Sequence, residues 1–170
     1  MEFLSRDNKI YVLDPNGSPA ITINSGDELI VETWDAFEGI RDPEVLEEKS
    51  LKGPATGPIW VNGAEPGDAL KIEFISITPK DGAAHMVMPG RGFLEEEFKD
   101  AYPTVMTLED GYVVLPSSIK LPVEPSMGVV ATTPTYPQNT ASDSGPYGGD
   151  IDMKELIAGS TIYLPIFVSG

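Results

Sequence analysis

Apolar and polar residues alternate with a period of two along much of the chain, which is the pattern of half-buried β-strands. The segment Ala20–Asn24 is a clear example, because its isoleucines alternate with threonine and asparagine. Turn sequences such as Asn62-Gly63 separate the segments and are typical of tight connections between strands. The pattern predicts strands over residues 9–13, 20–24, 28–34, 58–62, 69–77, 112–115, 118–122 and 127–132.

The alternation changes phase inside the segment 69–77. Leu70, Ile72 and Phe74 share one face, whereas Ile75 and Ile77 take the other. Because a shift of one residue turns every following side chain to the opposite face of a strand, the sequence predicts a β-bulge or a change of sheet near Phe74-Ile75.

Helical signals are few and short. Residues 41–49 combine Asp42, which is suited to the N-cap, with Pro43 at the first helical position. A second short helix is predicted over residues 93–101, and a third after Asp152, which precedes Glu155 by three residues as in a capping box. The long segments 80–92 and 133–149 predict a glycine-rich loop and a polar loop.

Composition supports a turn-rich all-β protein. Glycine (17 residues) and proline (16 residues) stand between apolar runs rather than in a low-complexity block. The chain has 170 residues, of which 41% are hydrophobic, and this is enough for a real core. We therefore expect a single domain over residues 1–170.

The formal net charge is −16, from 11 basic and 27 acidic residues. Such a surface repels nucleic-acid phosphates and anionic membranes, so we expect neither as a partner, whereas neutral ligands and cations remain compatible. No apolar run approaches the roughly 18 residues of a transmembrane helix, and the N-terminus lacks the apolar region of a signal peptide. Without cysteine the chain has no disulfide. These features predict a cytoplasmic protein.

The densest chemical signal is the stretch that runs from Tyr147 to Leu156. Paired glycines, Gly148 and Gly149, let a backbone approach a ligand closely and are candidate substrate-binding residues. Asp150 and Asp152 follow and are candidate metal ligands, because carboxylate oxygens suit hard or borderline cations. From spacing alone, helix capping is the favoured alternative for Asp152, so Asp150 is the better functional candidate.

A second group of acids, Glu32, Asp35 and Glu38, lies at the end of the predicted strand 28–34. Trp34 and Phe37 place apolar surface beside Asp35, and a desolvated carboxylate there would serve as a base or a metal ligand. The alternative is a strand end with solvated acids. Asp35 and Glu38 are our candidate catalytic residues.

Other functional residue types are sparse. His85 is the only histidine and is interpreted as incidental in its glycine-rich loop, so a multi-histidine zinc site within this chain is excluded. Arg91 is interpreted as a surface residue. A thiol nucleophile is excluded, and no Gly-x-Ser-x-Gly elbow is present.

Several segments, in the same order over nearly the whole chain, resemble motifs of the acetamidase/formamidase family. The blocks Gly-Ala-Glu-Pro-Gly-Asp and Gly-Gly-x-x-Asp are quite specific together. The matching stretches are Gly26-Asp27 with Glu32-Thr-Trp-Asp35, Gly53–Pro58, Val61–Asp68, Pro89–Leu94, and Gly148–Asp152 with Gly159–Pro165.

The resemblance implies a jelly-roll β-sandwich with a few short helices and long loops. It implies metal-assisted hydrolysis of formamide or acetamide to ammonia and the carboxylate, with zinc or calcium as the divalent ion, and a homo-oligomer. Asp35 and Asp152 match acidic positions of the family's motifs, whereas Asp150 stands where the family often has asparagine. Asp35 and Asp152 are therefore the metal ligands that the resemblance implies, and Asp150 is kept as a third candidate ligand from its place beside the paired glycines.

Relatives of this family continue into Gly-Asp-x-His and Gly-Asp-Gly-Glu segments, whereas this sequence ends at Ser169-Gly170. We expect either a second polypeptide that supplies those segments or a shortened relative, and an exposed strand edge near residue 168 that favours at least a dimer. The alternative function is a non-catalytic β-sandwich that binds a partner polypeptide or a metal. A carbohydrate-binding jelly roll is disfavoured, because only Trp34 and Trp60 would serve as sugar platforms.

Overall fold

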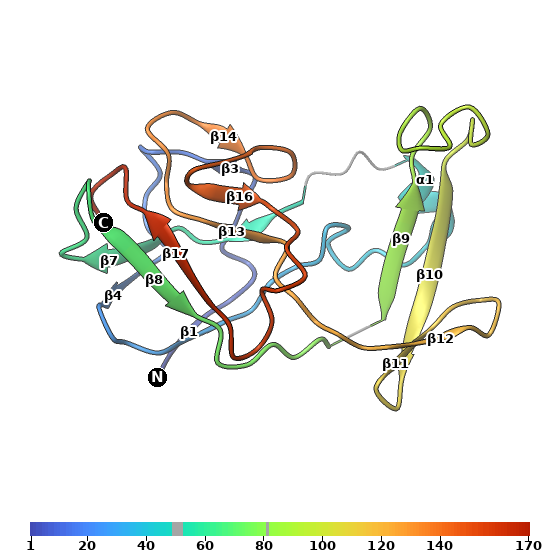
Figure 1. Cartoon of the computed structure of the whole chain (residues 1–170), viewed down its shortest axis with the longest axis horizontal. Helices are drawn as coiled ribbons and strands as arrows, with labels where there is room; N and C mark the ends of the chain where they lie inside the picture. Colours follow the sequence, from blue (N-terminus) through green and yellow to red (C-terminus); the bar gives the residue numbers. More distant parts are fainter. Residues whose placement is uncertain (49–52, 81) are drawn as a thin grey trace. The chain divides into compact units, whose positions relative to one another are not determined.

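A computed structural model describes residues 1–48, 53–80 and 82–170 (Figure 1). Within these residues the chain forms seventeen short strands and the helix α1 (Pro43–Glu48). The first eight strands are β1 (Glu2–Leu4), β2 (Lys9–Ile10), β3 (Val12–Leu13), β4 (Ile21–Asn24), β5 (Leu29–Val31), β6 (Ala55–Thr56), β7 (Ile59–Asn62) and β8 (Ala69–Glu73). The other nine are β9 (Ala83–Val87), β10 (Tyr102–Glu109), β11 (Tyr112–Val114), β12 (Lys120–Pro122), β13 (Val129–Ala131), β14 (Gln138–Asn139), β15 (Ser144–Gly145), β16 (Gly148–Asp150) and β17 (Thr161–Pro165).

The chain divides into two compact units, and each is described by itself. The first unit combines Met1–Glu38, Lys52–Ile77 and Pro125–Gly170, and the second combines Gly39–Leu51 and Thr78–Glu124. A compact unit is defined by its internal contacts, whereas a domain is defined by its ability to fold alone. A single domain over residues 1–170 therefore stays a prediction.

The first unit is built from small sheets. The pairs β1–β5 and β4–β7 are parallel, whereas β2–β6, β3–β14, β8–β17 and the three strands β13-β16-β15 are antiparallel. Strands β8 and β17 run side by side in Figure 1, from Thr161 opposite Glu73 to Pro165 opposite Ala69. Alternation turns the apolar residues of these strands inward. The buried hydrophobic residues of this unit are Leu4, Leu13, Phe37, Tyr147, Leu156, Leu164 and Ile166.

The second unit is a four-stranded antiparallel sheet in the order β12-β11-β10-β9, with α1 packed against β10. Among the side chains that the structure describes in this unit, Met86 of β9 is the buried hydrophobic one. The backbone N–H of Glu44 donates to Asp42 Oδ1 over 3.0 Å, which confirms Asp42 as the N-cap of α1. Lys49, the last residue of the predicted helix, lies outside the described residues.

The predicted fold class is confirmed, because the described chain is nearly all β, with a β-sandwich-like fold and few helices. Predicted strands are found as β4, β5, β7, β11, β12 and β13, and the predicted strand 9–13 is divided into β2 and β3. The predicted polar loop 133–149 is partly structured, since it contains β14, β15 and the first residues of β16. No helix in the described part of the chain is long and apolar enough to cross a membrane.

Two predictions in the second unit are wrong. The glycine-rich loop 80–92 contains strand β9, whose pairing with β10 compensates for a weak apolar pattern; Asp81 in that loop lies outside the described residues. Residues 93–97 form turns instead of a helix, with a helical hydrogen bond from the Phe98 N–H to the Leu94 carbonyl. Pro103, which follows the predicted helix in the sequence, lies inside β10.

Two predictions in the first unit are also wrong. No helix follows Asp152, which has a left-handed φ of +43° and therefore cannot cap one; buried Leu156 instead closes a turn onto the Met153 carbonyl. Strand β8 ends at Glu73 without a bulge, and Ile75 is 68% exposed. The change of phase therefore marks the end of the strand, shortly before the chain enters the second unit.

Candidate active site

Glu38 has the best-defined surroundings of the predicted catalytic residues. It lies in the turn that follows β5, and its side chain is only 15% exposed. Its Oε1 accepts hydrogen bonds from the Tyr11 hydroxyl at 2.6 Å and from the Lys9 ammonium at 2.5 Å. The left-handed φ of +53° costs a non-glycine residue about 1–2 kcal/mol. A residue held in that conformation by two side chains is a candidate for function.

Lys9 and Tyr11 complete this arrangement, which we call the Lys9–Tyr11–Glu38 cluster. The hydrogen bond with Glu38, followed by that with Tyr11, raises the pKa of Lys9 above its usual range, so Lys9 is an ammonium ion at neutral pH. Sequence reasoning assigned both residues to a strand and missed their contact with Glu38. The available signal was their spacing, because residues two apart in an extended segment project to the same side.

Asp35 stabilises the turn that contains Glu38. Its Oδ1 accepts a hydrogen bond from the Phe37 backbone N–H at 2.9 Å. Its backbone carbonyl accepts a hydrogen bond from the Glu38 backbone N–H at 3.0 Å. Phe37 is buried, but Asp35 is exposed, so the desolvated carboxylate expected beside Trp34 is not found. The Trp34 ring instead lies beneath the Arg6 guanidinium, 3.7 Å from ring centroid to Cζ.

Gly148 and Gly149 lie buried in β16, between β13 and β15. Their φ values are +91° and +105°. A Cβ on Gly148 would stand 2.2 Å from the Val130 carbonyl oxygen, and one on Gly149 would stand 2.2 Å from that of Asp143. The close approach that these glycines permit is therefore to neighbouring protein backbone, and their role toward a substrate stays a prediction.

Asp150 and Asp152 are brought close enough to interact. Partial burial, and then the negative charge of Asp152, raise the pKa of Asp150 above its usual range. Within the residues that the structure describes, no group of three or more His, Asp or Glu side chains has an arrangement that could hold a metal ion. Asp35 therefore does not complete a three-ligand site with this pair.

The remaining polar candidates lie in the second unit. His85 projects from β9, opposite Thr104 of β10, and is exposed. Arg91 is exposed in a turn closed by its own N–H on the Met88 carbonyl. The interpretation of both residues as incidental stays a prediction.

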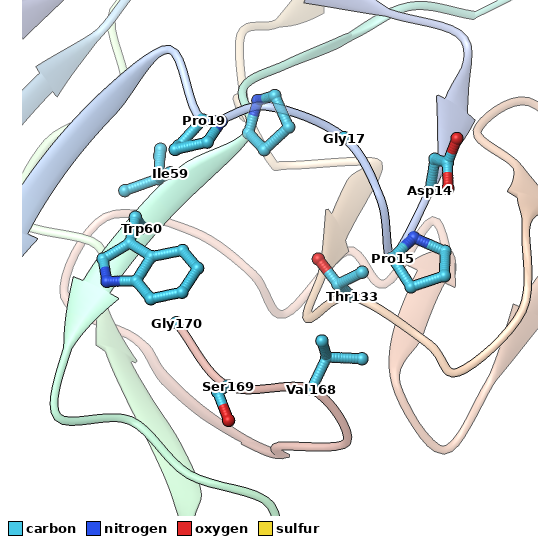
Figure 2. A pocket seen from close by; sticks show the side chains of 11 residues that line it. Asp14, Pro15, Gly17, Pro19, Ile59, Trp60, Thr133, Val168, Ser169 and Gly170 are labelled. Carbon is cyan, nitrogen blue, oxygen red and sulfur yellow. The ribbon is translucent and has the colours of Figure 1, made fainter.

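A groove of about 420 Å³ lies along β2 and β3, and its lining includes Lys9 and Tyr11. This volume is in the range of small-molecule sites, about 300–1,000 Å³. A smaller pocket of about 40 Å³ adjoins it and shares Asp14, Gly17 and Pro58 with it (Figure 2). The two hollows therefore have part of their lining in common.

Residues 11–143 match the sequence profile of the acetamidase/formamidase family, which is most of the chain. The chain belongs to the acetamidase/formamidase family. The resemblance seen in the sequence motifs is thus confirmed.

Solved structures agree with this assignment. A recombinant predicted acetamidase/formamidase from Thermoanaerobacter tengcongensis is 34% identical, with a TM-score of 0.93 over 100% of this chain. An acetamidase from Bacillus halodurans is also 34% identical, with a TM-score of 0.89 over 99% of the chain. A gamma lactamase from Delftia acidovorans, at 18% identity and a TM-score of 0.87 over 100% of the chain, shares the fold.

The chain corresponds to only part of the length of these relatives. It spans 58% of the length of the first two of these relatives and 59% of the third. No curated protein matches the sequence.

Proposed function

We propose that this chain contributes to the hydrolysis of a short-chain linear amide, formamide or acetamide, to ammonia and the carboxylate. Membership of the acetamidase/formamidase family supports an amidase-type reaction. The observation that carries the proposal is the Lys9–Tyr11–Glu38 cluster, whose Lys9 and Tyr11 side chains line a groove of about 420 Å³.

The cluster offers a route for the protons of hydrolysis. As water attacks the amide carbon, its proton passes to the Tyr11 oxygen while the Tyr11 proton passes to Glu38 Oε1, 2.6 Å away. The C–N bond then breaks as the Lys9 ammonium donates a proton to the leaving nitrogen. Glu38 returns its proton to Lys9 along their hydrogen bond. The balance is amide plus water to acid plus ammonia, and the acid ionises at neutral pH.

Asp35 has a supporting part in this proposal. Its two hydrogen bonds, through the side chain to Phe37 N–H and through the carbonyl to Glu38 N–H, fix the turn on which Glu38 stands. Asp35 therefore acts as a positioning residue for Glu38.

A divalent metal ion, zinc or calcium, stays a prediction. Asp150 and Asp152 would supply two oxygen ligands, but the described residues do not form a group that fits a complete site. A metal would therefore need donors beyond those of Asp35, Asp150 and Asp152, and the proton route above does not use one. Isothermal titration of zinc and calcium into wild-type and Asp152→Asn protein tests the prediction, which requires binding that the substitution weakens.

The experiment that tests the proposal is ammonia release from formamide and acetamide. It is measured on this chain, and on a chain extended by the part that the relatives possess, each with and without zinc or calcium. We expect ammonia from at least the extended chain, at a rate that depends on the protein concentration. Absence of ammonia from both chains under all conditions would overturn the proposal.

The second candidate function is a β-sandwich that binds a partner polypeptide or a further copy of itself. Phe3 and Ile30 are opposite each other on the parallel pair β1–β5, and they are 56% and 49% exposed. Adjacent exposed apolar side chains on a sheet are typical of a protein interface. The two candidates are compatible, because an amidase of this kind would itself be at least a dimer or pair with a second polypeptide.

We also propose that the protein works in the cytoplasm and binds neither nucleic acid nor membranes. The net charge of −16 disfavours anionic surfaces, and a chain without cysteine has no need of an oxidising compartment. Fluorescence microscopy of the tagged protein in cells tests this, and a peripheral membrane signal would contradict it.

A further inference from the structure

The two edges of the sheet β12-β11-β10-β9 differ in how they are protected. Edge strand β12 carries Lys120 and Pro122, and both residue types discourage the addition of a further strand, because a lysine charge resists burial and a proline has no N–H to donate. The other edge strand, β9 (Ala83–Val87), contains no proline, lysine or carboxylate. Among the strands that the structure describes, only β10 pairs with it (Figure 1). The outer edge of β9 therefore lacks the usual protection.

Proline in the neighbouring strand indicates which backbone groups of β9 point outward. Met86 lies opposite Pro103 of β10, which has no N–H to donate. This pair is therefore a non-hydrogen-bonded one, in which the N–H and C=O of Met86 point away from β10. Because the two kinds of pair alternate along an antiparallel ladder, Ala84 has the same orientation. The Met106 carbonyl oxygen agrees with this alternation, since it points toward β9 and lies 2.4 Å from where a Cβ of Gly82 would stand.

The outward backbone groups are bounded at both ends of the strand. The Gly82 carbonyl accepts a hydrogen bond from Arg41 Nη2 at 3.0 Å. The Met88 carbonyl accepts one from the Arg91 backbone N–H at 3.3 Å. The stretch of edge that is available to another strand therefore runs from residue 84 to residue 86.

Charge favours contact between copies of the chain at this edge. The chain has 27 acidic residues and a net charge of −16, so most of its surface repels a second copy. Residues 82–92 contain no Asp or Glu, and Arg91 is the one Lys or Arg among them. Two copies that approach through β9 therefore bring no carboxylates of this segment together.

The side chains of β9 suit pairing with a second β9. If two copies meet in antiparallel order about a twofold axis at His85, Ala84 of one copy lies opposite Met86 of the other, and Ala83 lies opposite Val87. Each pair combines a small side chain with a larger one. Ala84 and Met86 exchange hydrogen bonds, because both direct their N–H and C=O outward. His85, which is exposed, then lies opposite its counterpart in a non-hydrogen-bonded pair, where the two side chains are close.

We propose that β9 is a homodimerisation edge, at which two copies join their sheets by antiparallel pairing of Ala83–Val87 about a twofold axis at His85. The pairing makes one continuous sheet from the second units of both copies. It involves other residues than the exposed Phe3 and Ile30 face, and it does not depend on the proposed hydrolysis. Because few hydrogen bonds form, we expect a weak dimer that is populated at high protein concentration.

Charge exchange at His85 tests the register of this pairing. All proteins carry Phe3→Ser, which removes the other candidate interface, and sedimentation equilibrium is measured from about 10 µM to about 1 mM protein. His85→Glu and His85→Lys each place like charges opposite each other and are each expected to weaken the dimer about three- to tenfold. Their equimolar mixture places a carboxylate opposite an ammonium ion and is expected to dimerise at least about tenfold more tightly than either variant alone.

A matched control separates this effect from a general effect of charge. Thr161 of β17 is exposed and lies in the first unit. Thr161→Glu and Thr161→Lys change the net charge by the same amounts as the His85 variants. Each is expected to dimerise like the Phe3→Ser parent, and mixing them is expected to leave the affinity unchanged.

Amide hydrogen exchange tests the same contact at the backbone. In the monomer, the N–H groups of Ala84 and Met86 face solvent and are expected to exchange rapidly, whereas the His85 N–H is bonded to β10 and is expected to be protected. As the protein concentration rises, exchange of Ala84 and Met86 is expected to slow, and exchange of His85 is expected to change little.

Three outcomes would overturn the inference. One is a monomer at every concentration in the Phe3→Ser parent. Another is a dimer that has the same affinity in both His85 variants and in their mixture. The third is protection of the Ala84 and Met86 N–H groups at concentrations where the protein is monomeric, because another part of the chain then already covers this edge.

Discussion

At the residue scale, the two glycines of β16 show how one sequence feature serves a purpose other than the expected one. Gly148 and Gly149 combine positive φ angles with carbonyl oxygens 2.2 Å from where a Cβ would stand. Each therefore has two independent reasons to be glycine. Whether or not a substrate approaches them, the three-stranded sheet β13-β16-β15 requires both.

Substitution separates these two reasons. Gly149→Ala is expected to destabilise the fold by about 2–4 kcal/mol, because strain from the positive φ adds to a steric overlap. Gly26 is the matched control, since it has a similar φ of +90° but nothing within 4 Å of an added Cβ. Gly26→Ala is expected to cost only the conformational part, about 1–2 kcal/mol. Urea unfolding measures both, and equal losses would contradict the crowding seen around β16.

Asp150 makes a prediction about pH. Its folded pKa is raised above the ordinary value of 3.8 by partial burial and by Asp152. The folded protein therefore holds the Asp150 proton more tightly than the unfolded chain does. The contribution of Asp150 to the free energy of unfolding is fully present below pH 3.8 and is lost as the pH rises through the folded pKa. Asp150→Asn is therefore expected to raise the Tm at neutral pH without metal, by an amount that shrinks toward acidic pH. Thermal unfolding of both proteins between acidic and neutral pH measures this gain in Tm. A gain in Tm that is the same at every pH would contradict the raised pKa of Asp150 as its cause.

At the scale of elements, alternation in the sequence was sufficient to predict β4 and β7, because alternate side chains of these strands are partly buried and exposed. It was insufficient for β9 and β10. The sequence around His85 has no alternation, and Pro103 indicates a break, yet each strand pairs with the other over five residues. Non-local pairing of this kind overrides local propensity.

The candidate site could be predicted only in part for the same reason. Glu38 was identified from its position beside a strand end. Its partners Lys9 and Tyr11 lie 29 and 27 residues away in the chain, and no local pattern connects them to it. The capping role of Asp152 had a convincing spacing, but buried Leu156 closes a turn there instead of a helix.

The segment 133–149 is attached to the groove by Thr140, which is fully buried. Its hydroxyl donates a hydrogen bond to the Gly53 carbonyl at 2.7 Å, and its backbone N–H donates one to the Tyr11 carbonyl at 3.1 Å. Thr140→Val is expected to cost about 1–3 kcal/mol, because the Gly53 carbonyl loses a buried partner. Exposed Thr161→Val is the control in urea unfolding. The same small change in both variants would show that the bond does not stabilise the segment.

At the scale of the whole molecule, charge and exposed apolar surface act against each other. Copies that each carry −16 repel one another, and salt screens this repulsion. If copies meet through the Phe3 and Ile30 face, the average mass in sedimentation is expected to rise with ionic strength, and Phe3→Ser is expected to prevent the rise. Ile75→Ser, at another exposed apolar residue, is the control. A monomer at every ionic strength would contradict the expected dimer.

The central proposal is that the Lys9–Tyr11–Glu38 cluster contributes acid–base groups to amide hydrolysis at the groove. The most direct test is the rate of ammonia release from acetamide by the extended chain and by the same chain with Lys9→Met. The control is Lys71→Met, which removes an exposed lysine that also pairs with a glutamate, at 3.0 Å. Since positioned acid–base groups contribute about 10²- to 10⁴-fold, we predict a loss of at least about 100-fold in Lys9→Met and an unchanged rate in Lys71→Met. Equal rates in all three proteins would contradict the claim.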